Sequence, residues 1–190
     1  MNVYRKNLYA LVQPLLSGRS IGRALDFGSG DGWFAWTMRD EGLVTDFVAV
    51  DVHRRRRAIV EPLIYDGHRL PFDDRSFDLA YAFDVLHHCP DPVSNLRDLS
   101  RCTARYLLLK DHTYRSKTDW ACLSVLDELG NRRFGVRSVY RYQREWEWFP
   151  ILVEEGFAIK SIVHPAVCET RVPLRWFVNR LHFVALWERV

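Results

Sequence analysis

The residues best suited to hold a ligand form one short segment, Asp26-Phe27-Gly28-Ser29-Gly30-Asp31-Gly32. It lies between an apolar run that predicts a strand and an amphipathic run that predicts a helix. Glycines at such a turn permit a tight bend and let a ligand approach the backbone. Trp33 stands where a dinucleotide fingerprint needs a small residue, and no Gly-Lys-Ser/Thr follows, which excludes a Walker A loop. Asp26 and Asp31 would repel phosphate and favour a positively charged ligand.

Two further aspartates follow predicted strands. Asp51 ends the run 47–51 and comes 21 residues after Gly30, where a carboxylate binds ribose hydroxyls. Asp66-Gly67 ends the next strand, where the carboxylate could meet an adenine amino group. Each aspartate alone fits a turn or a helix cap equally well. Because ligands of open parallel sheets bind beyond the carboxyl ends of the strands, we expect Asp26, Asp51 and Asp66 to face one crevice.

Histidines follow the next two strands. His87 and His88 come after the fourth strand, and His112 ends the motif Lys110-Asp111-His112 after the fifth. An ordinary histidine titrates near pH ~6.5, so any of the three could act as a general base. A structural hydrogen-bonding role is the alternative, with Asp111 orienting His112 or touching substrate. No H-x-x-x-H pair or carboxylate triad is evident, so the sequence predicts no metal site.

The elements that must position these residues alternate between strands and helices. Strands are expected at about 23–27, 47–51, 63–66, 77–85, 106–110, 158–163 and 181–187, and helices at about 3–16, 33–41, 92–102, 118–129 and 147–155. Unbroken apolar strands between helices predict a parallel sheet covered on both faces. We expect an α/β, Rossmann-like doubly wound, mostly parallel sheet with an antiparallel C-terminal strand. Residues 1–190 form a single domain in this prediction, with a substrate-cap insertion around 112–150.

These motifs together resemble the class I S-adenosylmethionine (SAM)-dependent methyltransferase family over roughly residues 20 to 165. Asp26-x-Gly28-x-Gly30-x-Gly32 resembles its first motif, and Asp51 its ribose-binding acid. The stretch from Asp66 through Ser76-Phe77-Asp78 resembles its adenine-side segment, and 83–88 the segment near the methionine end and the substrate. Glu155-Gly156-Phe157 resembles its last helix-to-strand turn. The resemblance implies SAM as cofactor and a binding set of Asp26, Phe27, Gly28, Ser29, Gly30, Asp51, Asp66, Gly67, Phe83 and Asp84.

One segment departs from that family. A full helix is usual between the second and third strands, but residues 52–62 leave little room for one. This segment contains Arg54-Arg55-Arg56-Arg57, which is either a solvated face or a site for a phosphate or acidic partner. The wall that normally lies against the adenine is therefore uncertain in this sequence.

Composition limits the remaining alternatives. The 190 residues are 48% apolar with a net charge of +3, which suits one packed core and gives little support for nucleic-acid binding. No signal peptide or membrane span is apparent, and four scattered cysteines suit a reducing cytoplasm. The loop 130–136 and the aromatic residues after it indicate an apolar pocket, a basic-aromatic nucleic-acid surface or a packed cap.

The sequence thus predicts methyl transfer from SAM to an oxygen, nitrogen or carbon of a small-molecule acceptor. An RNA or protein methyltransferase is the first alternative, although no Asn/Asp-Pro-Pro-Tyr/Phe motif follows the fourth strand. A non-catalytic SAM-binding partner module is the second. A second copy of the chain remains a candidate partner.

Overall fold

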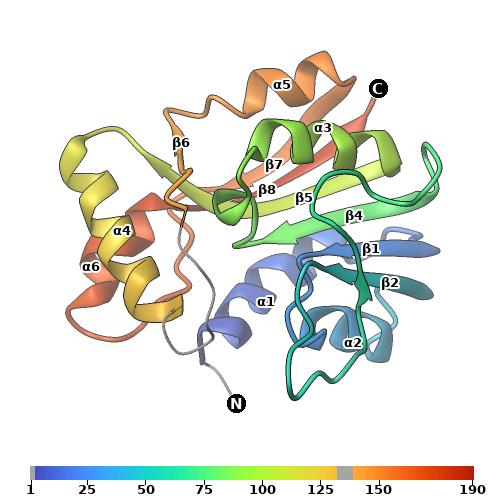
Figure 1. Ribbon diagram of the computed structural model, residues 1–190, viewed down its shortest axis with the longest axis horizontal. Helices are drawn as coiled ribbons and strands as arrows, with labels where there is room; N and C mark the ends of the chain where they lie inside the picture. The colour runs from blue at the N-terminus through green and yellow to red at the C-terminus, as the bar shows by residue number, and fades with distance from the viewer. Residues whose placement is uncertain (1–2, 132–138) are drawn as a thin grey trace.

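The computed structural model describes residues 3–131 and 139–190. Its strands form one eight-stranded sheet (Figure 1). They are β1 (Arg23–Phe27), β2 (Asp46–Asp51), β3 (Leu63–Ile64), β4 (Phe77–Phe83), β5 (Thr103–Tyr114), β6 (Gln143–Arg144), β7 (Phe157–Val163) and β8 (His182–Arg189). Their order is β3-β2-β1-β4-β5-β8-β7, and β6 pairs separately with the end of β5. Among the strands of the described residues, β8 alone runs opposite to the rest of the sheet, which confirms the predicted fold class.

Helices cover both faces of this sheet, as Figure 1 shows. They are α1 (Val3–Leu16), α2 (Trp33–Asp40), α3 (Pro92–Cys102), α4 (Lys117–Asn131), α5 (Phe149–Glu154) and α6 (Leu174–Val178), with 3-10 turns η1 (Leu86–His88) and η3 (Asn179–Leu181). One core packs α3 and α5 against the sheet, and a second packs α1 and α2 against its other face. A sheet buried on both faces explains the unbroken apolar runs of the central strands.

The remaining helical elements lie at the end of the sheet to which β4 points (Figure 1). The turn η1 follows β4 there, and α4 and α6 lie beyond the same ends of the strands. Local chemistry fixes where α3 begins after η1, because Asp91 caps α3 by accepting from the Ser94 N–H at 3.0 Å and Pro92 occupies its first turn. This end of the sheet therefore carries the glycine turn and the histidines.

Several bounds differ from the expectation. β3 stops at Ile64, so Asp66 lies beyond the strand, whereas β5 continues through Asp111 and His112 because β8 pairs with those residues. β6 and α6 were not predicted. Residues 52–62 contain no helix, as expected. Gly130 and Asn131 close α4, and the rest of the predicted loop 130–136 lies outside the described residues.

Within the described part of the chain, no helix has both the length and the apolar character that a membrane span requires.

Candidate active site

The glycine turn is anchored to the neighbouring strand. The Gly28 and Ser29 N–H groups both donate to the carbonyl of Val50, at 2.9 and 3.0 Å. Gly28, Gly30 and Gly32 have φ angles of 70°, 62° and 75°, which side-chain-bearing residues adopt only at a cost. The turn therefore requires the glycines that the sequence motif supplies.

The space around the backbone differs among the three glycines. A Cβ at Gly28 would lie 2.5 Å from Val85, and one at Gly32 would lie 2.5 Å from Val60, so both positions serve close internal packing. A Cβ at Gly30 would meet nothing nearer than Arg55, at 3.9 Å. Gly30 is thus the position where open space adjoins the backbone, as a ligand cradle requires.

Asp26 lies beneath this turn and is only 4% exposed. Burial raises its pKa to about 7, the nearby Tyr81 hydroxyl acts in the opposite direction, and the charge of Asp51 adds to the increase. Asp26 Oδ2 and Ser29 Oγ are buried without a hydrogen-bond partner among residues 3–131 and 139–190. A buried carboxylate and hydroxyl beside an open glycine turn fit a cationic, polar ligand such as SAM.

The other two aspartates lie at the same end of the sheet, Asp51 as the last residue of β2 and Asp66 two residues after β3. Asp51 sits on the turn, because its Oδ2 accepts from the Gly30 N–H at 2.9 Å and its Oδ1 from the His53 N–H at 3.0 Å. Asp66 is exposed, and its Oδ1 accepts from the His68 N–H at 2.9 Å, which lowers its pKa. The strand order β3-β2-β1 thus brings Asp26, Asp51 and Asp66 to one end of the sheet, and Asp66 is the one exposed to solvent.

Asp84 joins the site to the first helix. The Tyr4 hydroxyl donates to Asp84 Oδ2 at 2.7 Å, and the fully buried Lys110 ammonium contacts both Asp84 and Tyr4. Burial alone would raise the pKa of Asp84, but Lys110 outweighs it and the pKa is lowered. Phe83 stacks on Tyr81 at 4.9 Å between ring centroids. Asp84 is therefore held in an internal ion pair.

His87 is buried between two carboxylates. Its Nδ1 lies 2.6 Å from Asp111 Oδ1, and its Nε2 lies 3.6 Å from Asp127 Oδ1. Burial lowers the pKa of His87, but the charge of Asp111 outweighs this and the value rises to about 10. The neighbouring carboxylates therefore favour the imidazolium form of His87, which makes it the weakest of the three predicted histidines as a base.

The pKa values of His88 and His112 are lowered, whereas that of His87 is raised. Burial and the charge of His87 lower the pKa of His88 to about 4. Burial and the charge of Lys110 lower the pKa of His112, whose ring lies 4.8 Å from that of His87. Both imidazoles are neutral at pH 7, so they are the predicted histidines that can accept a proton.

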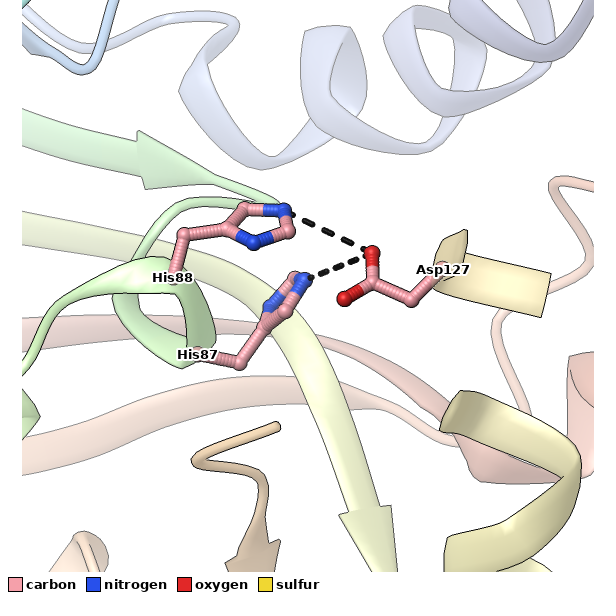
Figure 2. A group of neighbouring side chains, drawn as sticks. All are labelled: His87, His88 and Asp127. Carbon is pink, nitrogen blue, oxygen red and sulfur yellow. Dashed lines mark ion pairs between the residues drawn. The ribbon is translucent and has the colours of Figure 1, made fainter. Parts of the chain in front are cut away.

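Two residues of this cluster were not predicted. Asp127 comes from α4, where its Oδ1 lies 3.6 Å from Nε2 of His88 (Figure 2). The Tyr142 hydroxyl donates to Asp127 Oδ2 at 3.1 Å, and its ring centroid lies 5.3 Å from that of His87. No motif spacing links Asp127 to histidines some forty residues earlier, so only the fold brings them together.

Some polar atoms of the cluster are left over. His88 Nδ1, Asp111 Oδ2 and His182 Nδ1 are buried with no hydrogen-bond partner within the described ranges. Groups of this kind are normally satisfied by water or a ligand. The arrangement therefore combines a fixed imidazolium, two neutral imidazoles and spare hydrogen-bonding capacity beside the glycine turn, which suits proton handling on a polar substrate.

Comparison with known proteins assigns the chain to a family. A family model described as a methyltransferase domain matches residues 2–162, so the chain belongs to that family. Curated protein sequences yield no match. Among solved structures, it resembles YcgJ of Bacillus subtilis (16% identity, TM-score 0.67, 97% of this chain and 98% of that one). It also resembles an S-adenosylmethionine-dependent methyltransferase of Mesorhizobium loti (16%, 0.66, 93% and 96%).

A third similar structure is the [4+2]-cyclase SpnF, with 16% identity and a TM-score of 0.67 over 98% of this chain and 80% of that one. At such identities the structural likeness establishes the fold. The family match establishes the class: the protein is a class I SAM-dependent methyltransferase, and SAM is its cofactor.

Proposed function

We propose that the protein transfers the methyl group of SAM to an oxygen, nitrogen or carbon atom of a small-molecule acceptor. The observation that carries this proposal is the cluster of His87, His88, Asp111, His112 and Asp127 beside the cofactor turn, of which His87 and Asp111 are buried. Val85 connects the two, because its methyl groups pack on Gly28 and η1 begins at the next residue. A small polar acceptor placed among these groups would lie close to the cofactor.

The cofactor residues have distinct roles in this proposal. The backbone at Phe27–Gly30 cradles the methionine end, and Asp26 beneath it faces the positive charge. Asp51, already fixed by the Gly30 N–H, accepts from the ribose hydroxyls, and Asp66-Gly67 borders the adenine. Phe83 and Asp84 line the wall between cofactor and acceptor. Buried Asp26, whose Oδ2 has no hydrogen-bond partner in the described part of the chain, is the residue that supports a cationic occupant most directly.

The acceptor side belongs to the segment around 112–150, which we propose as a substrate cap. It supplies α4, with Asp127, and Tyr142 beside β6. SAM provides a methyl group already activated by a positive sulfur, so the protein has mainly to align the two partners and exclude water. Where the acceptor must lose a proton, His112 is the histidine that takes it.

A pair of aspartates on one strand tests the cofactor assignment. Asp51→Ala should weaken SAM binding at least tenfold by calorimetry, because it removes the ribose acceptor. Asp46→Ala, at the opposite end of β2 and exposed, is the matched control and should leave affinity unchanged. Equal affinity in both variants would remove Asp51 from the site.

The acceptor class needs its own experiment. Labelled methyl transfer from SAM is compared across small-molecule, RNA and protein fractions of a cell extract, and label is expected in the small molecules. Arg54–Arg57 motivates the RNA alternative, although Arg54 already pairs with Glu61. RNA methylation together with steeply salt-dependent RNA binding would overturn the proposal. SAM binding without transfer to any fraction would favour the non-catalytic module. Cytoplasmic location and self-association stay predictions.

A further inference from the structure

Three metal-ligating atoms converge at the acceptor side of the site. One ligand atom each from His87, His88 and Asp127 lies within 4.8 Å of the other two, and Nε2 of each histidine faces Oδ1 of Asp127. Figure 2 shows both imidazoles turned toward the same carboxylate oxygen, at 3.6 Å each. Ligands of a tetrahedral zinc ion with bonds of about 2.0–2.1 Å stand about 3.3 Å apart, so small side-chain shifts would close the set.

Hydrogen bonds from other residues orient two of these three ligands, His87 and Asp127. Asp111 contacts Nδ1 of His87 at 2.6 Å, which orients the ring and directs Nε2 toward Asp127. Tyr142 donates to the other oxygen of Asp127 at 3.1 Å. Carboxylate–histidine and hydrogen-bonded carboxylate partners are the usual outer contacts of a protein metal site.

A second grouping, His87 with Asp111 and His112, is less suitable. The 2.6 Å between His87 Nδ1 and Asp111 Oδ1 is a hydrogen-bond distance and too short for two ligands of one ion. The same contact leaves Nε2 as the coordinating nitrogen of His87. Of the two groupings, the one that includes His88 and Asp127 is therefore selected.

Charge favours a dication. Asp111 and Asp127 bring two negative charges to the imidazoles, while the nearby charge of Asp84 is matched by Lys110. Two imidazole nitrogens and one carboxylate oxygen are a donor set for zinc and for other divalent first-row metals. We propose that His87, His88 and Asp127 bind a divalent transition-metal ion, zinc above all, and that the ion displaces the proton from Nε2 of His87 into solvent. Three protein ligands leave a position for water or, given the proposed function, a substrate oxygen.

The test uses the metal alone, without SAM. Protein freed of metal by a chelator is titrated with zinc chloride by calorimetry, and one ion per chain is expected. Asp127→Asn and His88→Asn should each weaken the binding at least tenfold. Matched controls are Glu128→Gln, the next carboxylate on α4, and His68→Asn, an exposed histidine. Both controls should bind zinc as the unchanged protein does.

A second measurement requires no variant. Cobalt(II) added to the unchanged protein should give the intense visible absorption of a four-coordinate site, and zinc-edge X-ray absorption should show two imidazole ligands. Sub-stoichiometric zinc binding, equal affinity in Asp127→Asn and Glu128→Gln, or a six-coordinate cobalt spectrum would overturn the proposal. SAM affinity is measured on the same samples, so failure of the metal site is distinguished from failure of the proposed function.

Discussion

Nδ1 of His87 and Oδ1 of Asp111 lie 2.6 Å apart, with only 1% of either side chain exposed. Asp111→Asn keeps the shape but removes the charge that compensates the buried imidazolium. We expect the free energy of unfolding to fall by about 3 kcal/mol, as is typical when one partner of a buried ion pair is removed. Urea denaturation measures this. Asp46→Asn, on the exposed start of β2, should cost under about 0.5 kcal/mol, and equal losses would contradict the interpretation.

Asp26 predicts a pH dependence of stability. Its pKa is about 7 in the folded chain against an ordinary 3.8, so the unfolded chain releases this proton first as pH rises. The contribution of Asp26 to the free energy of unfolding is therefore fully present below pH ~4 and decreases as the pH rises toward ~7. Relative to Asp26→Asn, the unchanged protein without SAM should lose about 2.5 kcal/mol between pH 5 and pH 8.

Urea denaturation of the two proteins at both pH values checks this, because other titrating groups cancel in the difference. A constant difference between them would show that Asp26 is not perturbed.

The buried Lys110 predicts a rescue by a second substitution. Lys110→Met leaves Asp84 without its cation and should lower the free energy of unfolding by about 3 kcal/mol. Adding Asp84→Asn removes the orphaned charge, and asparagine tolerates the left-handed backbone at this position, where φ is 56°. The double variant should recover at least half of the loss. A double variant as unstable as the sum of the single ones would argue against direct coupling.

Gly30 and Gly32 form a matched pair. Both have positive φ, so alanine at either position should cost about 1 kcal/mol in backbone strain. At Gly32 the new Cβ also overlaps Val60 at 2.5 Å, and the loss there should reach about 2–4 kcal/mol. At Gly30 the free energy of unfolding should fall only by the strain, and the main effect of Gly30→Ala should be weaker SAM binding. Urea denaturation and SAM calorimetry on both variants measure this, and equal stability losses would contradict it.

Local sequence patterns predict which residues gather at the glycine turn. Asp26, Gly28, Gly30 and Asp51 lie on two neighbouring strands and the turn between strand and helix, where period, glycine and strand end are visible within a few residues. The sheet order then brings them together by a general rule of parallel sheets. This is why the fold class, the family and the cofactor are confirmed.

The acceptor side depended on contacts distant along the chain. Asp127 is one acidic residue on an amphipathic helix, and nothing in its neighbourhood distinguishes it from a solvated one. Tyr4 reaches Lys110 from the first helix, across 106 positions. The roles of the three histidines likewise depended on burial and on which carboxylate each ring meets, so the sequence could name them but could not separate His87 from His88.

The contact between Gly28 and Val85 couples the position of the glycine turn to that of the segment before the histidines. Only a hydrogen atom on Gly28 separates the cofactor turn from the valine that precedes the histidine turn. Displacement of either backbone segment must therefore shift the other, since neither has slack to absorb it. A larger side chain at position 28 would therefore displace the glycine turn and the segment after β4 together.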